Sequence, residues 1–223
     1  MDERFEIGAQ RIVLRVQEEG APIVYVPMPE GDGADVWARC QELSCPPFTM
    51  VAIEVLDWKD DLSPWPCPPL TRTDTECAGH AEGELALLSG EIVPAAENRL
   101  SAPPSFRAVA GYSLGGLFAL WSLYRTDIFV RAASASGSLW FPDFLSYARS
   151  RNFAGMPERI YLSLGSKEHK TPNRMLRSVK ERTREFSDLL QERGIEHIFE
   201  INPGNHFKDE DLRIAKGIAW LLR

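Results

Sequence analysis

The chain has no long run of apolar residues and no apolar segment near its start. A membrane-spanning helix needs about 20 consecutive apolar residues, and no stretch of this sequence approaches that length. The first four residues, Met1 to Arg4, read Met-Asp-Glu-Arg and lack the apolar core of a signal peptide. We therefore expect a cytoplasmic protein that does not interact with a membrane.

Basic residues are also too few for a general nucleic-acid binder. The chain has 25 Lys and Arg against 32 Asp and Glu, which gives a net charge of −7. Binding to phosphate backbones needs clustered cations, so nucleic acid is not expected as a partner. An anionic substrate is still compatible with this composition, because a local patch can differ in charge from the whole chain.

Cysteines are sparse, and their spacing contains no C-x-x-C pair. The four of them, Cys40, Cys45, Cys67 and Cys77, are too few for a disulfide scaffold in a chain of 223 residues and fit a reducing compartment. Cys77 and His80 could contribute to a metal site, but structural zinc requires four closely spaced ligands. Buried or loop thiols are the simpler interpretation, and we expect no metal.

What the chain does contain is enough apolar material for a packed core. Hydrophobic residues make up 44% and aromatic residues 10% of the sequence, and one domain over residues 1–223 is expected. Short β-branched runs alternate with segments of helical period, a pattern typical of βαβ units around a mostly parallel sheet. The expected strands are residues 11–16, 23–26, 49–55, 106–110, 130–135, 160–164 and 197–201. The expected helices are residues 34–42, 82–100, 117–124, 142–151, 172–193 and 210–222.

Three local features qualify this pattern. Pro94 lies inside the expected helix 82–100 and predicts a kink or an early end there. Thr171 is the expected N-cap of the helix 172–193. Residues 57–80 form a proline-rich irregular stretch that is too long for a simple connection, and such loops often frame a site.

A Gly-Tyr-Ser-Leu-Gly segment from Gly111 to Gly115 lies between an expected strand and an expected helix. In this context G-x-S-x-G is typical of a nucleophile elbow, in which Ser113 occupies a strained turn and its neighbours must lack bulk. The turn would present the hydroxyl at a helix N-terminus, where the N–H of Leu114 can bind a developing oxyanion. The alternative is that the glycines only allow close packing and Ser113 is inert.

A serine nucleophile needs a base within hydrogen-bonding reach, and the sequence offers four histidines. His80 belongs to the irregular stretch, His197 begins a strand, and His169 follows the strand that ends near Leu164. His206 lies just beyond the last strand, in the turn Asn-Pro-Gly-Asn-His. Because sites of such folds collect at the carboxyl ends of the strands, His206 is the predicted base.

The third member of the triad should follow the strand before the histidine if the order is Ser, acid, His. The segment from Gly165 to His169 contains one carboxylate, that of Glu168, which we predict to orient His206. The alternative for Glu168 is a solvated carboxylate paired with a neighbouring lysine. Asp209 and Asp211 are weaker candidates, since they can simply cap the last helix.

A second oxyanion donor is expected from the loop after an earlier strand, the one that ends near Val55. The backbone N–H of Asp57 or of Trp58 would supply it. Trp58, Trp65 and Trp140 lie in expected site loops and favour an aromatic or apolar substrate. Ordinary core or rim packing remains the alternative for each of them.

In these residues and in several longer segments, the chain resembles the putative-esterase family of α/β-hydrolases, which includes siderophore esterases, feruloyl-type esterases and S-formylglutathione hydrolases. The matching segments are Ala110 to Leu117 (AGYSLGGL), Ser136 to Trp140 (SGSLW), Asp61 to Pro66 (DLSPWP) and Gly204 to His206. The resemblance implies an α/β-hydrolase fold with a mostly parallel sheet and helices on both faces. It also implies Ser113 as nucleophile and His206 as base.

Within and beside these segments we expect five residues to contact substrate: Tyr112, Trp65, Ser138, Trp140 and Lys167. From Lys167 to Arg184 the chain has an excess of Lys and Arg over Glu. Most of these cations fit a solvated helix face. Lys167 and Lys170, however, stand beside the predicted acid and could concentrate an anionic substrate.

The sequence therefore predicts a serine carboxylic ester hydrolase that acts through an acyl-enzyme on a small-molecule ester, without metal or organic cofactor. The ester could be aromatic or anionic, and a siderophore ester is one option. The same residues would also serve an acyltransferase or a thioesterase. A catalytically silent hydrolase fold used for binding is the alternative outside enzymology.

Overall fold

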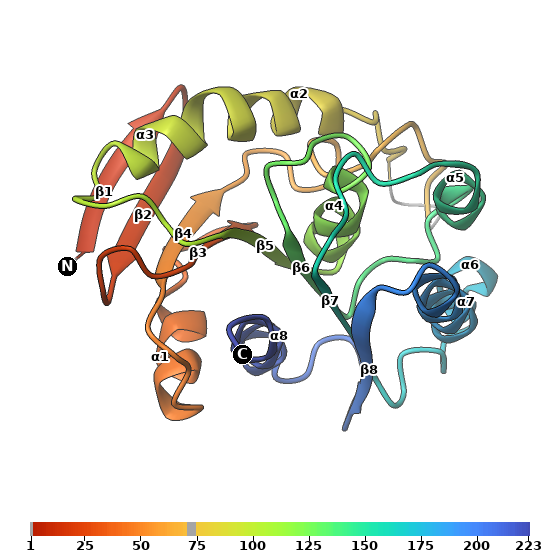
Figure 1. The fold of residues 1–223 in the computed structure, drawn as a ribbon. Coiled ribbons are helices and arrows are strands. Elements are labelled where there is room, and N and C mark those ends of the chain that lie inside the picture. The colour runs from red at the N-terminus through yellow and green to blue at the C-terminus, as the bar shows by residue number, and fades with distance from the viewer. Residues whose placement is uncertain (1, 71–74) are drawn as a thin grey trace.

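The computed structural model describes residues 2–70 and 75–223, and its centre is an eight-stranded sheet. The strand order is β1-β2-β4-β3-β5-β6-β7-β8 (Figure 1). β2 runs antiparallel to both of its neighbours, and the strands from β4 to β8 are parallel to one another. The strands are β1 (Asp2–Ile7), β2 (Gln10–Val16), β3 (Ile23–Met28), β4 (Thr49–Glu54), β5 (Arg107–Tyr112), β6 (Arg131–Ala135), β7 (Arg159–Gly165) and β8 (Glu196–Asn202).

Helices cover both faces of this sheet (Figure 1). One face carries α1 (Ala34–Glu42) and α8 (Glu210–Leu221). The other face carries α2 (Ala81–Leu87), the π-helical η1 (Leu88–Ile92), α3 (Val93–Glu97), α4 (Leu114–Ser122), α5 (Phe144–Ser150) and α7 (Val179–Glu192), with the short α6 (Arg174–Arg177) before α7. The expected fold class, a mostly parallel sheet between two helical layers, is therefore correct.

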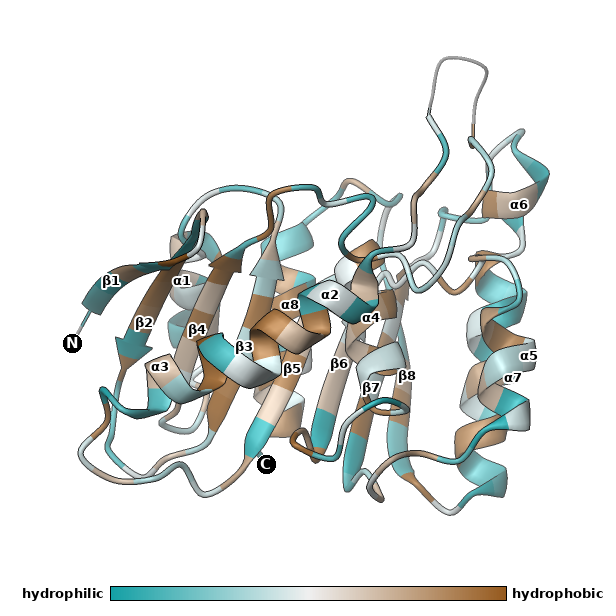
Figure 2. Ribbon diagram, turned by 90° about the horizontal axis from the view of Figure 1, so that it is seen from above, coloured by the Kyte–Doolittle hydropathy of each residue, from teal (hydrophilic) through white to brown (hydrophobic). Residues whose placement is uncertain are grey.

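The central strands are buried on both faces, which explains their nearly continuous apolar sequences. β3, for example, reads Ile-Val-Tyr-Val-Pro-Met, with its first five residues buried. Figure 2 shows hydrophobic residues along the middle of the sheet and hydrophilic ones toward the strand ends. All nine residues of α4 are buried, so this helix lies in the core and its N-terminus is fixed at the carboxyl end of β5.

Some local predictions were wrong for identifiable reasons. β1 was not predicted because its sequence, Asp-Glu-Arg-Phe-Glu-Ile, is mostly charged and alternates between exposed and half-buried positions at the sheet edge. The helix expected from residue 117 begins at Leu114. The expected helix 172–193 is divided into α6 and α7, and its N-cap is Asn173, whose side chain accepts hydrogen bonds from two backbone N–H groups, rather than Thr171.

Pro94 does not end the helical segment that contains it. The chain widens into the π-helical η1 just before the proline, and Pro94 then occupies the first turn of α3, where its missing N–H costs little. The irregular stretch 57–80 holds one isolated bridge between Cys67 and Cys77 in its described part, and residues 71–74 lie outside the described residues.

The cysteines of the described chain are thiols, with Cys45 half-buried and the other three buried. Within residues 2–70 and 75–223, no three His, Cys, Asp or Glu side chains are grouped so that they could hold a metal ion. In the same residues, no helix combines the length and the apolar character needed to cross a bilayer.

A buried carboxylate in α2 gives a test of the packing on this face. Glu84 is 7% exposed, and Gln10 Nε2 donates to it at 2.7 Å. Burial raises the pKa of Glu84 to about 7, against the lowering effect of the Gln10 hydrogen bond and with a further contribution from Asp61. Because the folded state holds this proton more tightly than the unfolded state, stability is lost as pH rises from about 4.5 through 7.

We therefore expect Glu84→Gln to increase the free energy of unfolding at pH 8 by about 2 kcal/mol and to change it little at pH 5. Urea denaturation at the two pH values measures this difference. Glu91→Gln, at an exposed position of η1, is the matched control and should show no such pH dependence. Equal effects of Glu84→Gln at both pH values would contradict the assignment.

Candidate active site

Ser113 occupies a strained turn between β5 and α4. Its backbone angles are φ 54° and ψ −118°, a conformation that a residue with a side chain adopts only when its surroundings enforce it. The Ser113 N–H donates to the carbonyl of Ala135 at 3.1 Å, and its carbonyl accepts from the N–H of Ser138 at 3.0 Å. The end of β6 and the loop after it therefore hold the turn in place.

The two glycines of the motif are required by close contacts. A Cβ atom at Gly111 would lie 2.3 Å from the backbone of Gly115, and a Cβ atom at Gly115 would lie 2.9 Å from the ring of Trp58. At Gly111 the strand and the helix are too close for a side chain, and at Gly115 the Trp58 ring occupies the space that a side chain would need. This explains the G-x-S-x-G spacing in physical terms.

The predicted nucleophile, base and acid lie in one chain of hydrogen bonds. His206 Nε2 is 3.1 Å from Ser113 Oγ, and His206 Nδ1 is 2.9 Å from Glu168 Oε2. Glu168 lies in the loop after β7, and His206 lies in the loop after β8. With the proton on Nδ1, the imidazole donates to Glu168 and its Nε2 can accept the proton of the serine hydroxyl.

The loops that carry acid and base are fastened to each other. Ser166 N–H donates to the carbonyl of Asn202 at 2.7 Å, and Lys167 N–H donates to the carbonyl of Gly204 at 2.9 Å. These bonds continue the parallel pairing of β7 and β8 beyond the strand ends. The distance between Glu168 and His206 is therefore set by the sheet.

The Glu168 side chain is only 4% exposed and is fully hydrogen-bonded. Ser136 Oγ donates to Oε1 at 2.8 Å, Arg213 Nη1 donates to the same oxygen at 3.0 Å, and the Gly165 N–H also donates to it. Burial by itself would raise the pKa of Glu168, but hydrogen bonds led by that from His206 outweigh it and lower the pKa below its ordinary value. Glu168 is thus ionised at neutral pH and suited to stabilise an imidazolium.

Ser136 and Arg213 were not predicted from the sequence. The signal that could have found Arg213 is a cation within the apolar stripe of α8, beside Ile214 and four residues before Gly217. A charged residue in a buried stripe needs a partner, and Glu168 is that partner. Ser136 carries no comparable signal, because a serine in a loop is ordinary.

The first predicted oxyanion donor lies where the sequence suggested. Leu114 is the first residue of α4, and the leading N–H groups of a helix have no intrahelical acceptor. The N–H of Asp57, one of the two candidates for the second donor, already donates to Asp61 Oδ2 at 3.1 Å, which disfavours that prediction. Trp58 lines the cavity beside Ser113, and its part as a donor remains a prediction.

The order of the strands explains why the loop after β4 is less suited than the loop after β3 to supply the second oxyanion donor. β3 lies between β4 and β5, so the loop after β3 is closer to the elbow in the sheet than the loop after β4. The β3–α1 loop, residues 29–33, indeed lines the same cavity as Ser113 and His206. Sequence reasoning missed this loop because the sequence does not show that β3, and not β4, lies beside β5 in the sheet.

Two cavities meet at Ser113, His206 and Phe207. One, of about 450 Å³, lies between the β3–α1 loop, Trp58 and the start of α8. The other, of about 420 Å³, lies beneath α6 and the start of α7. Phe207 is 80% exposed and its ring stands edge-on to the His206 imidazole, so this side chain borders both cavities.

Four of the five predicted substrate contacts lie at these cavities. Tyr112 lines the first cavity, and its ring centroid is 5.3 Å from that of His206. Ser138, Trp140 and Lys167 line the second cavity, and Ser138 Oγ is 3.4 Å from Ser113 Oγ.

Trp65 is the exception among the predicted substrate contacts. Its Nε1 donates to the carbonyl of Pro142 at 3.0 Å, and its ring packs against those of Phe141 and Tyr147. Among the described residues, Trp65 lines neither of the two cavities. This packing disfavours the predicted substrate contact, because the tryptophan anchors the irregular stretch to the loop before α5.

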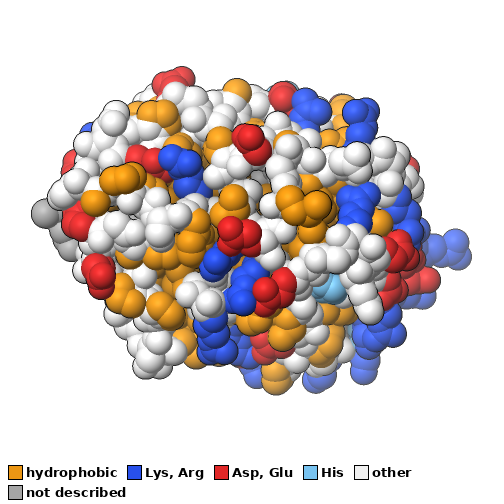
Figure 3. Space-filling model, in the orientation of Figure 1, with side chains coloured by type: hydrophobic (Ala, Val, Ile, Leu, Met, Phe, Trp, Pro, Cys, Tyr) orange, Lys and Arg blue, Asp and Glu red, His pale blue; other side chains and the backbone are white. Residues whose placement is uncertain are grey.

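Charge on the surface is unevenly distributed. Figure 3 shows Lys and Arg side chains gathering on the side that bears α6 and α7, with some acidic side chains among them. This agrees with the cation excess that begins at Lys167. Lys167 and Lys170 both line the second cavity, where Glu168 is the one carboxylate among the described lining residues.

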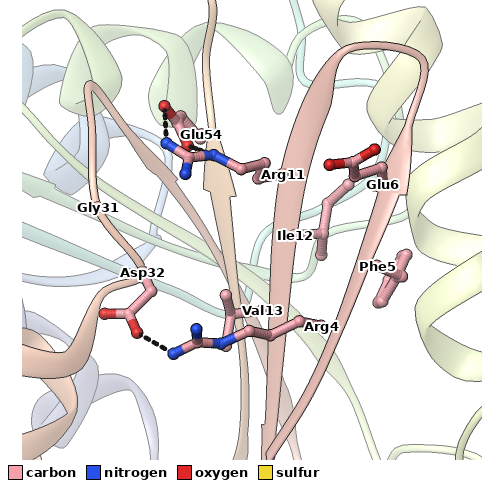
Figure 4. Close-up of a pocket in the computed structure, with 9 residues that line it drawn as sticks. All are labelled: Arg4, Phe5, Glu6, Arg11, Ile12, Val13, Gly31, Asp32 and Glu54. Atoms are coloured by element: carbon pink, nitrogen blue, oxygen red, sulfur yellow. Dashed lines mark hydrogen bonds and ion pairs between the residues drawn. The ribbon is translucent and has the colours of Figure 1, made fainter.

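The largest cavity described, about 630 Å³, is a different one (Figure 4). It lies over β1, β2 and the β3–α1 loop, and four of its five charged side chains are joined in the pairs Arg4–Asp32 and Arg11–Glu54. None of the three hydrogen-bonded residues Ser113, His206 and Glu168 lines it. Its size therefore gives no reason to move the candidate site.

Comparisons with known proteins give a family match, a relative in sequence and several structural likenesses. The Putative esterase family matches residues 22–210 of the chain. The Uncharacterized protein YbbA of Bacillus subtilis (strain 168) is 24% identical over 186 residues, which span 78% of this chain and 73% of that protein. An IroE-like serine hydrolase from Shewanella oneidensis superimposes with a TM-score of 0.80 at 19% identity, over 100% of this chain and 79% of that one.

The siderophore hydrolase EstA from Aspergillus nidulans superimposes with a TM-score of 0.76 at 20% identity. The match covers 100% of this chain and 93% of EstA. At these identities the two structural likenesses establish a common fold, and that fold is the α/β-hydrolase fold expected from the sequence.

The bond between Glu168 and His206 gives the test of this site. We expect Glu168→Gln to lower kcat for ester hydrolysis by about 10³-fold, because an amide does not stabilise the imidazolium and can hold the wrong tautomer. Steady-state kinetics with a chromogenic ester measure the effect, with circular dichroism as the folding control. Glu181→Gln, on the exposed side of α7, should behave as the unaltered protein. More than a tenth of the original kcat in Glu168→Gln would exclude Glu168 as the orienting acid.

Proposed function

The chain belongs to the Putative esterase family and is a carboxylic ester hydrolase, and on this premise we propose that it acts through a covalent acyl-enzyme on Ser113. The observation that carries the proposal is the hydrogen-bonded series of Ser113, His206 and Glu168, with separations of 3.1 and 2.9 Å. A serine hydroxyl needs such a base to become a nucleophile at neutral pH.

Acylation begins when Ser113 Oγ attacks the ester carbonyl carbon and His206 Nε2 takes the hydroxyl proton. The Glu168 carboxylate stabilises the resulting imidazolium through Nδ1–H. The negative charge on the former carbonyl oxygen is stabilised by the Leu114 N–H at the start of α4. A second N–H comes from Trp58 or from the β3–α1 loop, both of which line the first cavity. When the tetrahedral intermediate collapses, His206 returns its proton to the leaving alkoxide, and the alcohol departs.

Deacylation repeats these steps with water. His206 Nε2 takes a proton from a water molecule as its oxygen attacks the acyl carbon, and the proton then returns to Ser113 Oγ as the bond to the acyl group breaks. The products are the carboxylic acid and the regenerated serine. Every proton transfer uses side chains of this chain, so the reaction as written needs no metal or organic cofactor.

The two cavities support a substrate with a sizeable group on each side of the ester. Each cavity, at about 450 and 420 Å³, falls within the range of small-molecule sites. The second cavity combines the ring of Trp140 with the cations of Lys167 and Lys170, which favours an aromatic or anionic group. A siderophore ester is one substrate of this kind, and EstA is a siderophore hydrolase.

Labelling with a fluorophosphonate tests the nucleophile. We expect Ser113→Ala to abolish labelling and to lower ester hydrolysis by at least about 10³-fold, since Ser113 is the hydroxyl that pairs with His206 Nε2 among residues 2–70 and 75–223. The reacted peptide is identified by mass spectrometry. Ser150→Ala, at an exposed position of α5, is the control and should label fully. Labelling that persists in Ser113→Ala on another residue would move the nucleophile there.

Charge in the second cavity gives a separate test of substrate class. We expect Lys167→Ala combined with Lys170→Ala to lower kcat/KM for an anionic aryl ester by about fivefold and to leave a neutral ester of the same size nearly unchanged, because screened surface cations contribute modestly. The difference should shrink at high salt. Lys180→Ala, on α7 and outside this cavity, is the matched control. If the ratio of kcat/KM for the anionic ester to that for the neutral ester is the same in the double variant as in the unaltered protein, Lys167 and Lys170 do not favour an anionic substrate.

A further inference from the structure

Arg213 is a buried cation that the proposed reaction does not use directly. Its side chain lies on α8 and is 1% exposed. One terminal nitrogen, Nη1, donates to Glu168 Oε1 at 3.0 Å, to Ser136 Oγ at 2.9 Å and to the Tyr112 hydroxyl at 3.1 Å. This nitrogen thus contacts the acid and both of the hydroxyl groups beside it.

The other terminal nitrogen of Arg213 is bonded to the loop that carries the base. Nη2 donates to the carbonyl of Pro203 at 3.0 Å and to the carbonyl of Asn205 at 2.9 Å. His206 is the next residue after Asn205, and its carbonyl accepts a hydrogen bond from the Tyr112 hydroxyl. One planar guanidinium therefore joins the acid loop to the base loop.

A buried arginine by itself contributes little to the stability of a fold. Removing a guanidinium from water is costly, and apolar residues of similar volume often replace buried ion pairs without loss of stability. The fork of Arg213, however, supplies donors in fixed directions to two loops at once, which neither a lysine nor an apolar side chain can do. Its geometry points to a role in the site.

We propose that Arg213 is a positioning residue that fixes Glu168 against His206 and, through its charge, opposes protonation of the imidazole. The inference rests on the proposed roles of these two residues. Without the cation, a protonated imidazole and the Glu168 carboxylate would form a neutral pair. With it, the same protonated group carries a net positive charge.

The other titratable groups near His206 are less buried or uncharged. Tyr112, from β5, has its pKa raised to about 12 mainly by burial and is neutral at physiological pH. The charged residues lining the two cavities are Glu30, Asp32, Asp35, Glu210 and Asp211 on one side and Lys167 and Lys170 on the other. All of them are half-buried or exposed, so solvent screens their effect on the imidazole more than it screens that of Arg213.

The experiment separates geometry from charge with two substitutions at one position. Arg213→Lys keeps the charge but cannot bridge both loops, so kcat is expected to fall about tenfold while the midpoint of the acid limb of kcat/KM against pH stays in place. Arg213→Met removes the charge as well, and the midpoint is expected to rise by about one pH unit, with a fall in kcat of about 100-fold.

Lys216→Met is the matched control, because Lys216 is a cation on the same helix that pairs with Glu200 at 2.6 Å. It should leave the midpoint of the acid limb and kcat unchanged. Circular dichroism checks folding, and Arg213→Gln is the second neutral variant if Arg213→Met does not fold, because an amide retains hydrogen-bond donors. A residue with only a structural role would lower the melting temperature without moving the midpoint.

An unchanged midpoint in the folded neutral variant would overturn the electrostatic role. A wild-type kcat in Arg213→Lys would overturn the positioning role. If the unaltered protein neither hydrolyses esters nor reacts with a fluorophosphonate, the proposed function fails instead, so the two failures are distinct. All proteins are measured with one neutral chromogenic ester, which removes effects of substrate charge.

Discussion

The buried carboxylate of Glu168 is the interaction on which the rest of the site depends. It accepts hydrogen bonds from the imidazole of His206, from Ser136 and from Arg213, and these partners come from three different parts of the chain. An ionised group at this depth would be strongly unfavourable without such partners. Because all of them are present, its pKa is lowered in spite of burial, and the charge is available where the reaction needs it.

Three elements of the sheet bring these groups together. β5 ends in the strained turn of Ser113, while β7 and β8 end in the loops of Glu168 and His206. In Figure 2 the parallel strands point toward the edge above which α6 rises, and the candidate site follows that edge. The buried, apolar α4 fixes the position of the serine, so the nucleophile is held by the core and the substrate cavities are formed by the loops around it.

Much of this arrangement could be predicted because two of its features are visible in the sequence: the glycines that flank Ser113 and the position of each site residue after a strand. The glycines at 111 and 115 mark a strand and a helix in close contact, and the chain order of Ser113, Glu168 and His206 places each of them after a strand. Parallel strands end at one edge, so residues far apart in sequence could be expected to meet there. The family resemblance added the fold but did not identify the acid.

What could not be predicted depends on packing between distant residues. A tryptophan in an irregular loop is typical of a substrate site, yet the ring of Trp65 packs against those of Phe141 and Tyr147. The sequence does not show that the Asp57 N–H donates a hydrogen bond to the carboxylate of Asp61. The sequence also gives no distance between Arg213 and Glu168, because their pairing depends on how α8 packs against the sheet.

The most direct test of the account is the identity of the covalent intermediate. The protein is mixed with a chromogenic ester, quenched in acid within the first turnover and measured as the intact chain and then as peptides. The account predicts a burst of alcohol, a mass increase equal to one acyl group, and the acyl group on the peptide that contains Ser113. A turnover without any acylated protein, or an acyl group on a different residue, would contradict it.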